Sequence, residues 1–118
     1  FQLKFNRKNY PLQSLLAETL WQSKQYKQSA RVLSQLSNQR KEDPVVWYKL
    51  AEVRGLAGDI SGVHKARAEY FILIGAFERA KQQLNLAAKL LAYDFKQLSI
   101  IEQRVIDIEQ MEKTLRRI

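Results

Sequence analysis

The chain has 118 residues, 46% of them hydrophobic, which is enough to line a continuous core in one compact domain. It contains no cysteine, so disulfides, thiolate zinc sites and cysteine nucleophiles are excluded. The formal net charge is +8. Residues 1–43 hold 8 basic and 3 acidic side chains, residues 44–93 hold 7 and 4, and residues 94–118 hold 5 and 5. No apolar run approaches the roughly 18 residues that are needed to cross a bilayer.

The first segment, residues 1–10, is expected to be the remnant of a preceding helix or a linker. It opens on Phe1, and the single methionine of the chain is internal. We therefore expect the protein to begin before this segment, with any signal peptide removed or left out of the sequence.

The rest of the sequence predicts an all-α chain, because helix-forming residues fill long windows and valine and isoleucine never alternate with period two. Pro11 and Pro44 suit helix starts, and Gly58 and Gly75 suit turns. Asp43 before Pro44 predicts an N-cap followed by a proline in the first turn. We expect helices at about 11–23, 25–40, 44–57, 60–74, 76–91 and 94–117.

A repeat appears when Ala17, Ala51 and Ala68 are aligned, because similar kinds of residue follow each alanine at the same offsets. Ala51 lies 34 residues after Ala17, and Ala68 lies half that distance further on. A helix pair of 34 residues, with small residues where the helices cross, is typical of tetratricopeptide (TPR) repeats. We therefore expect residues 11–93 to form a TPR-like right-handed superhelix of antiparallel helix pairs, in which helix 60–74 belongs to two pairs.

Packing within such pairs requires small residues at the helix crossings and large ones just after the turns. The expected small residues are Ala17, Ser29, Ala51, Ala68 and Ala80, and the expected large ones are Tyr26, Ile60 and Phe77. Three positions depart from the TPR pattern: Arg54 and Arg67 replace bulky apolar residues, and Lys24 replaces a turn glycine. The second pair is therefore expected to pack less regularly.

Residues 94–118 predict a long C-terminal capping helix that closes the open end of the stack. Its apolar side chains recur at spacings of three and four, and they are Phe95, Leu98, Ile101, Val105, Ile108, Met111 and Leu115. A coiled-coil oligomerisation helix is the alternative, although Glu112 interrupts its roughly three heptads.

One face of the first helix in each unit is the candidate protein-binding groove. The candidates are Ser14, Glu18 and Trp21 in the first unit, Tyr48, Glu52 and Gly55 in the second, and Lys65, Glu69 and Ile72 in the third. Aromatic side chains offer a peptide apolar contact at low entropic cost. The alternative for each residue is an ordinary solvated or half-packed surface position.

No catalytic, metal or cofactor site is predicted in these residues. His64 is the only histidine and has no cysteine beside it, so we interpret it as a surface or packing residue. Neither an acid/base pair nor a glycine-rich phosphate loop is present. The basic excess, which includes Lys24, Lys27 and Arg31, is compatible with an acidic protein or an anionic membrane surface. A nucleic-acid binder is the less favoured alternative, because no aromatic platforms are interleaved with the basic residues.

The second and third units together carry a closer resemblance. The run Leu50-Ala51-Glu52-Val53-Arg54-Gly55-Leu56-Ala57-Gly58, followed by Ala66-Arg67-Ala68-Glu69-Tyr70, Gly75 and Ala80, resembles the C-terminal repeat domain of the BepA (β-barrel assembly-enhancing protease) family of periplasmic zinc metallopeptidases. Residues 44–90 resemble it well and the front of the chain weakly. In that family the zinc-binding His-Glu-x-x-His helix lies in a separate N-terminal domain, and nothing here matches it.

This resemblance implies a repeat domain in the periplasm of a Gram-negative bacterium, serving outer-membrane protein quality control. Its expected partners are the β-barrel assembly machinery or its β-barrel clients, together with its own protease domain in cis. The domain would raise the local concentration of a client at a tethered active site, or restrain the protease by packing over its cleft. A free-standing TPR adaptor, unconnected with proteolysis, is the alternative that shares every fold feature.

Overall fold

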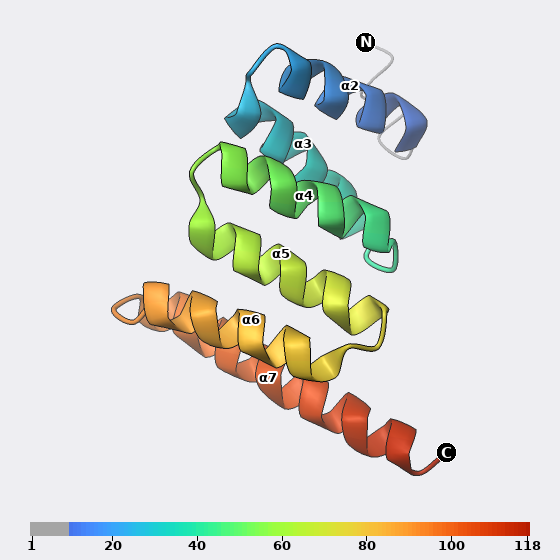
Figure 1. The fold of residues 1–118 in the computed structure, drawn as a ribbon, viewed down its shortest axis with the longest axis vertical. Coiled ribbons are helices and arrows are strands. Elements are labelled where there is room, and N and C mark those ends of the chain that lie inside the picture. The colour runs from blue at the N-terminus through green and yellow to red at the C-terminus, as the bar shows by residue number, and fades with distance from the viewer. Residues whose placement is uncertain (1–9) are drawn as a thin grey trace.

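The computed structural model describes residues 10–118, and within this range the chain forms six α-helices and no strand (Figure 1). The helices are α2 (Tyr10–Gln22), α3 (Tyr26–Gln39), α4 (Pro44–Leu56), α5 (Ile60–Leu73), α6 (Phe77–Leu90) and α7 (Phe95–Arg116). The predicted all-α class is confirmed, and each predicted helix boundary lies within one residue of the observed one. The expectation for residues 1–9 lies outside the described residues, and Tyr10 begins α2 instead of ending the first segment.

Aspartates fix the starts of three helices. Asp43 Oδ1 accepts a hydrogen bond from the Val45 amide at 3.0 Å, as the Asp-Pro pair predicted. Asp59 and Asp94 cap α5 and α7 in the same way, at 3.0 and 3.1 Å. Each carboxylate satisfies an amide that has no partner inside its helix, so the chain enters these helices at defined residues.

The turns after α2, α4 and α5 share one backbone geometry. Lys24, Gly58 and Gly75 have positive φ angles of 63°, 85° and 79°. The amide that follows each of them donates to the carbonyl five residues back, at 2.8–2.9 Å. This is the hydrogen bond of a Schellman motif, which favours glycine at the left-handed position. Lys24 therefore takes the place of the turn glycine, as its position in the repeat predicted.

The helices follow one another in chain order along the long axis of the molecule (Figure 1). Helices α2, α4 and α6 begin at residues 10, 44 and 77, and helices α3, α5 and α7 begin at residues 26, 60 and 95. The intervals are therefore 33 to 35 residues, close to the spacing of the aligned alanines. Helix α5 packs against both α4 and α6, which agrees with its expected place in two pairs.

Two apolar clusters form the core. The first joins α2 to the front of α5, ending at Val63 and Ala66, and the second begins at Ala68 and continues through α6 into α7. The five small residues expected at the helix crossings, Ala17, Ser29, Ala51, Ala68 and Ala80, are all at most 5% exposed. The Ser29 hydroxyl donates to the Ala17 carbonyl at 2.7 Å, which satisfies a polar group at the crossing of α2 and α3.

The expectation that a large residue fills the gap after each turn is wrong for Ile60. Tyr26 and Phe77 pack against the two clusters, but Ile60 is 50% exposed. The Arg54 side chain lies over the first turn of α5 instead, where its Nη1 donates to the Gly62 carbonyl at 3.1 Å. Burial of this guanidinium lowers the pKa of Arg54.

Helix α7 packs against α6 along part of the predicted apolar seam (Figure 1). Ile101 and Ile108 are buried, and Val105 packs against them. The two ends of the seam are exposed, since Phe95 is 80% and Leu115 is 53% accessible to solvent. The seam is therefore used at its centre, where α7 crosses the preceding helices.

Candidate binding site

A pocket of about 250 Å³ lies between α2 and α4, above α3. Its lining residues are Ser14, Ala17, Glu18, Trp21, Leu33, Lys49, Glu52, Val53 and Leu56. Pockets that hold whole small molecules usually measure about 300–1,000 Å³. The size of this pocket therefore suits one or two side chains of a docked polypeptide.

Each of the two walls is a single helix stripe. The α2 wall uses residues 14, 17, 18 and 21, and the α4 wall uses residues 49, 52, 53 and 56. Both sets have the spacing 0, 3, 4, 7, which places their members on one side of a helix. The two walls are offset by 35 residues, whereas the repeat is 34, because neighbouring helices face each other with opposite sides.

The pocket has an apolar floor and a charged rim. Ala17, Leu33 and Val53 belong to the first core cluster and are 3–5% exposed, so they form a fixed floor. Glu18 and Glu52 are exposed at the rim, and within the described residues neither forms an ion pair. With Lys49, also exposed, the formal charge of the lining is −1 in a chain of net charge +8.

Four of the nine predicted groove residues meet in this pocket: Ser14, Glu18, Trp21 and Glu52. The sequence analysis missed the five others, Ala17, Leu33, Lys49, Val53 and Leu56. The α4 members were detectable as a stripe at spacing 0, 3, 4, 7. Exact 34-residue offsets led instead from Ser14 and Trp21 to Tyr48 and Gly55, which lie on the other side of Glu52.

Tyr48 and Gly55 lie on the α5 side of α4, outside the pocket. The Tyr48 ring is 53% exposed and is tilted against Tyr70, with ring centroids 5.4 Å apart. A methyl group at Gly55 would be 3.6 Å from the Val63 side chain, which places Gly55 beside α5. These two residues therefore border the packed α4–α5 surface.

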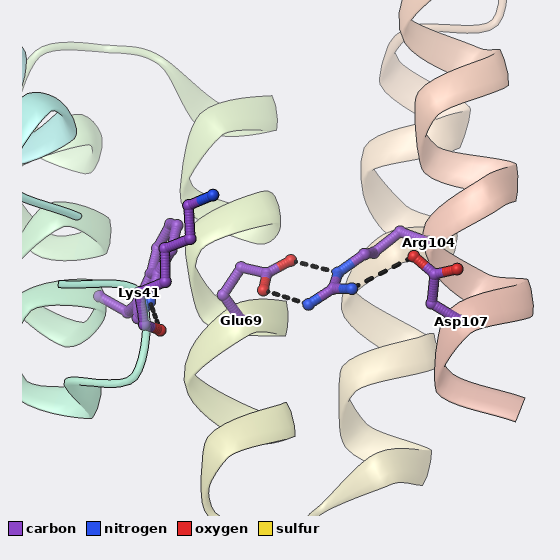
Figure 2. Close-up of polar contacts among 5 residues, drawn as sticks. Lys41, Glu69, Arg104 and Asp107 are labelled. Carbon is purple, nitrogen blue, oxygen red and sulfur yellow. Dashed lines mark hydrogen bonds and ion pairs between the residues drawn. The ribbon is translucent and has the colours of Figure 1, made fainter. Parts of the chain in front are cut away.

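The third predicted set faces α7 or the second core cluster. Lys65 Nζ donates to Gln97 Oε1 at 3.0 Å, and Ile72 packs against the cluster. Figure 2 shows Arg104 of α7 gripping Glu69 with two nitrogens, at 2.8 and 2.7 Å, while a third nitrogen donates to Asp107 at 3.2 Å. Hydrogen bonds from Glu69 raise the pKa of Arg104. Another helix of the chain thus covers this part of the predicted groove.

The other sequence candidates lie apart from the pocket. His64 Nδ1 lies 2.8 Å from Gln83 Oε1, in a half-buried contact between α5 and α6. In residues 10–118 no group of three histidine, aspartate or glutamate side chains is placed to hold a metal ion. Lys24, Lys27 and Arg31 are exposed around the α2–α3 turn. None of the helices in this range is long and apolar enough to span a membrane.

No protein-family model matches the sequence, and a search of curated proteins finds no match to it. Function is therefore argued from the pocket itself. Its fixed apolar floor can hold a side chain, and its exposed carboxylates can orient that side chain by charge and hydrogen bonding.

Proposed function

We propose that this chain is a protein-interaction module that captures a segment of another polypeptide in the pocket between α2 and α4. The carrying observation is that residues from two helices spaced by one repeat, Glu18 and Trp21 from α2 and Glu52 from α4, line one cavity with an apolar floor. A preformed floor lowers the cost of ordering the protein when a ligand binds.

We assign the module to the TPR-like class of right-handed superhelices. Helix starts at intervals of 33 to 35 residues support this assignment, as do the buried small residues at the crossings. The recurring turn geometry at Lys24 and Gly58, also 34 residues apart, is a third supporting observation. In such stacks the first helices of successive units line the inner surface, and α2 and α4 hold these places.

The wider role that we propose follows from the resemblance of residues 44–90 to the BepA family. The module would recruit β-barrel clients or their assembly machinery in the periplasm and deliver them to a metallopeptidase domain. Zinc chemistry would belong to that separate domain, because the residues here do not fit a zinc site. Their one histidine, His64, contacts Gln83 and has no acidic neighbours arranged around it.

Site-specific photo-crosslinking in cells tests both levels of the proposal. A photoreactive amino acid at Trp21 or Glu52 should crosslink to an outer-membrane β-barrel protein or to its assembly machinery. The same probe at Gln35, an exposed residue of α3 that does not line the pocket, is the matched control. Equal crosslinking from Gln35 would contradict the pocket assignment, and crosslinks to an unrelated partner would contradict the role in outer-membrane assembly.

Alanine variants supply an independent measurement. Trp21→Ala and Glu52→Ala should each weaken partner capture while leaving the midpoint of urea unfolding nearly unchanged, because both side chains are exposed. Tyr48→Ala should also lower that midpoint, since the contact of Tyr48 with Tyr70 contributes about 1 kcal/mol to such a pair. Undiminished capture by the Trp21 and Glu52 variants would argue against the pocket.

A further inference from the structure

The three aligned alanines are each followed by a glutamate, and the three glutamates have different surroundings. The glutamates are Glu18, Glu52 and Glu69. Glu69 is occupied by Arg104, whereas the other two have no ion-pair partner among the described residues. The third position therefore shows which chemical group a carboxylate in this register can hold.

The contact at Glu69 is a two-pronged ion pair. Arg104 Nε and Nη2 reach the two carboxylate oxygens at 2.8 and 2.7 Å, the paired geometry that a guanidinium forms with a carboxylate (Figure 2). Arg104 comes from α7, an amphipathic helix whose Ile101 and Ile108 are buried beside it. The ligand at this position is thus an arginine flanked by apolar residues on one helix.

The pocket between α2 and α4 presents a similar surface with its carboxylates free. Glu18 and Glu52 stand on opposite walls, and Ala17, Leu33 and Val53 form the floor between them. An aliphatic stem is favoured on such a floor, and a cation is favoured between the carboxylates. The lining is negative although the chain as a whole is positive, so a basic segment is attracted to this pocket and repelled by other parts of the surface.

We propose that the pocket binds an arginine side chain from a partner polypeptide, with its stem on the apolar floor and its guanidinium between Glu18 and Glu52. This inference rests on the proposed function and specifies the partner segment as an arginine with apolar neighbours. Arginine fits better than lysine, because its planar group offers five donors to two carboxylates and lysine offers three from one point.

The first experiment selects phage-displayed random 12-residue peptides on the immobilised chain. Selected peptides should share an arginine next to leucine, phenylalanine or another apolar residue. Selection on the Glu18→Gln/Glu52→Gln double variant should lose this preference, because glutamine keeps the shape of the side chain and removes its charge. A matched control is Glu102→Gln, which removes an exposed carboxylate on α7 that has no ion pair in the described part of the chain.

The second experiment titrates one selected peptide, labelled with fluorescein, and measures anisotropy. Replacing its arginine with citrulline, which has nearly the same shape and no charge, should weaken binding to the wild-type chain roughly tenfold. Each single glutamine substitution should weaken arginine-peptide binding roughly threefold. In the double variant the arginine and citrulline peptides should bind equally well, and Glu102→Gln should behave as wild type.

The outcomes separate this inference from the proposed function. Peptides that bind and are weakened by Trp21→Ala, but show no preference for arginine, would overturn the arginine pocket and leave peptide capture standing. A preference for acidic peptides would also overturn it. If no peptide is selected or bound, both the arginine pocket and the peptide-capture function are refuted.

Discussion

Replacing Lys24 with glycine is expected to stabilise the fold. Lys24 has a φ of 63°, in the left-handed region, and its exposed side chain forms no hydrogen bond or ion pair in the described structure. The left-handed conformation costs a residue with a Cβ about 1–2 kcal/mol. Glycine returns about 0.4–1 kcal/mol of this through its greater freedom in the unfolded chain. The net gain in the free energy of unfolding is therefore about 0.5–1 kcal/mol.

Two kinds of control isolate this conformational effect. Lys24→Gln removes the charge near the end of α2, which itself contributes about 0.3–1 kcal/mol, and it retains the Cβ. The glycine variant should therefore be more stable than the glutamine variant by about 1 kcal/mol. Gly58→Ala and Gly75→Ala should change stability in the opposite direction by about 1 kcal/mol. A Cβ at either glycine has no atom within 4 Å, so steric clash does not contribute.

Urea unfolding followed by far-UV circular dichroism measures these differences. The Lys24→Gly midpoint should rise at unchanged slope, and the thermal midpoint should rise by about 4 °C for each kcal/mol. A glycine variant less stable than the glutamine variant, or an alanine at Gly58 that costs nothing, would refute the shared turn geometry.

Other predictions concern contacts between helices. Glu69→Gln and Arg104→Gln should each destabilise the fold, and a double-mutant cycle should give a coupling of about 1 kcal/mol between them; additive effects would contradict the ion pair. Ser29→Ala should cost about 1 kcal/mol in urea unfolding, since it removes the bond to the Ala17 carbonyl; a neutral effect would show that this bond contributes nothing. The pKa of Asp107 is lowered from 3.8, first by a hydrogen bond from Gln103 and then by Arg104. Its contribution to stability is therefore present above about pH 4 and lost as the pH falls through the lowered pKa; Asp107→Asn should reduce the loss of stability below pH 4, and an unchanged acid transition would contradict this.

The helical architecture was predictable because its signals are local. The aspartate at 43 and the proline at 44 mark a helix start, the glycines at 58 and 75 mark turns, and the alanine spacing marks the crossings. Each of these features acts within one or two turns of helix, where residue type largely decides the conformation. Lys24 was placed correctly only because the repeat required a turn there.

The site was less predictable because it depends on which sides of the helices meet. Glu18 and Glu52 were found through the repeat, but Lys49 was missed because a pocket between two helices uses opposite sides of them. The contact of Glu69 with Arg104 joins residues 35 positions apart, and nothing near Glu69 in the sequence signals it. The exposure of Ile60 likewise depends on where the Arg54 side chain lies, which the turn pattern does not encode.

Helix α5 gives side chains to both apolar clusters, so neither half of the molecule is complete without it. Helices α2 and α7 each close one end of the described stack and rely on fewer neighbours. Fraying can therefore start independently at α2 and at α7, and each opening must reach α5 before it affects the opposite half. Backbone amides in α5 should exchange with deuterium last, and those in the terminal helices first.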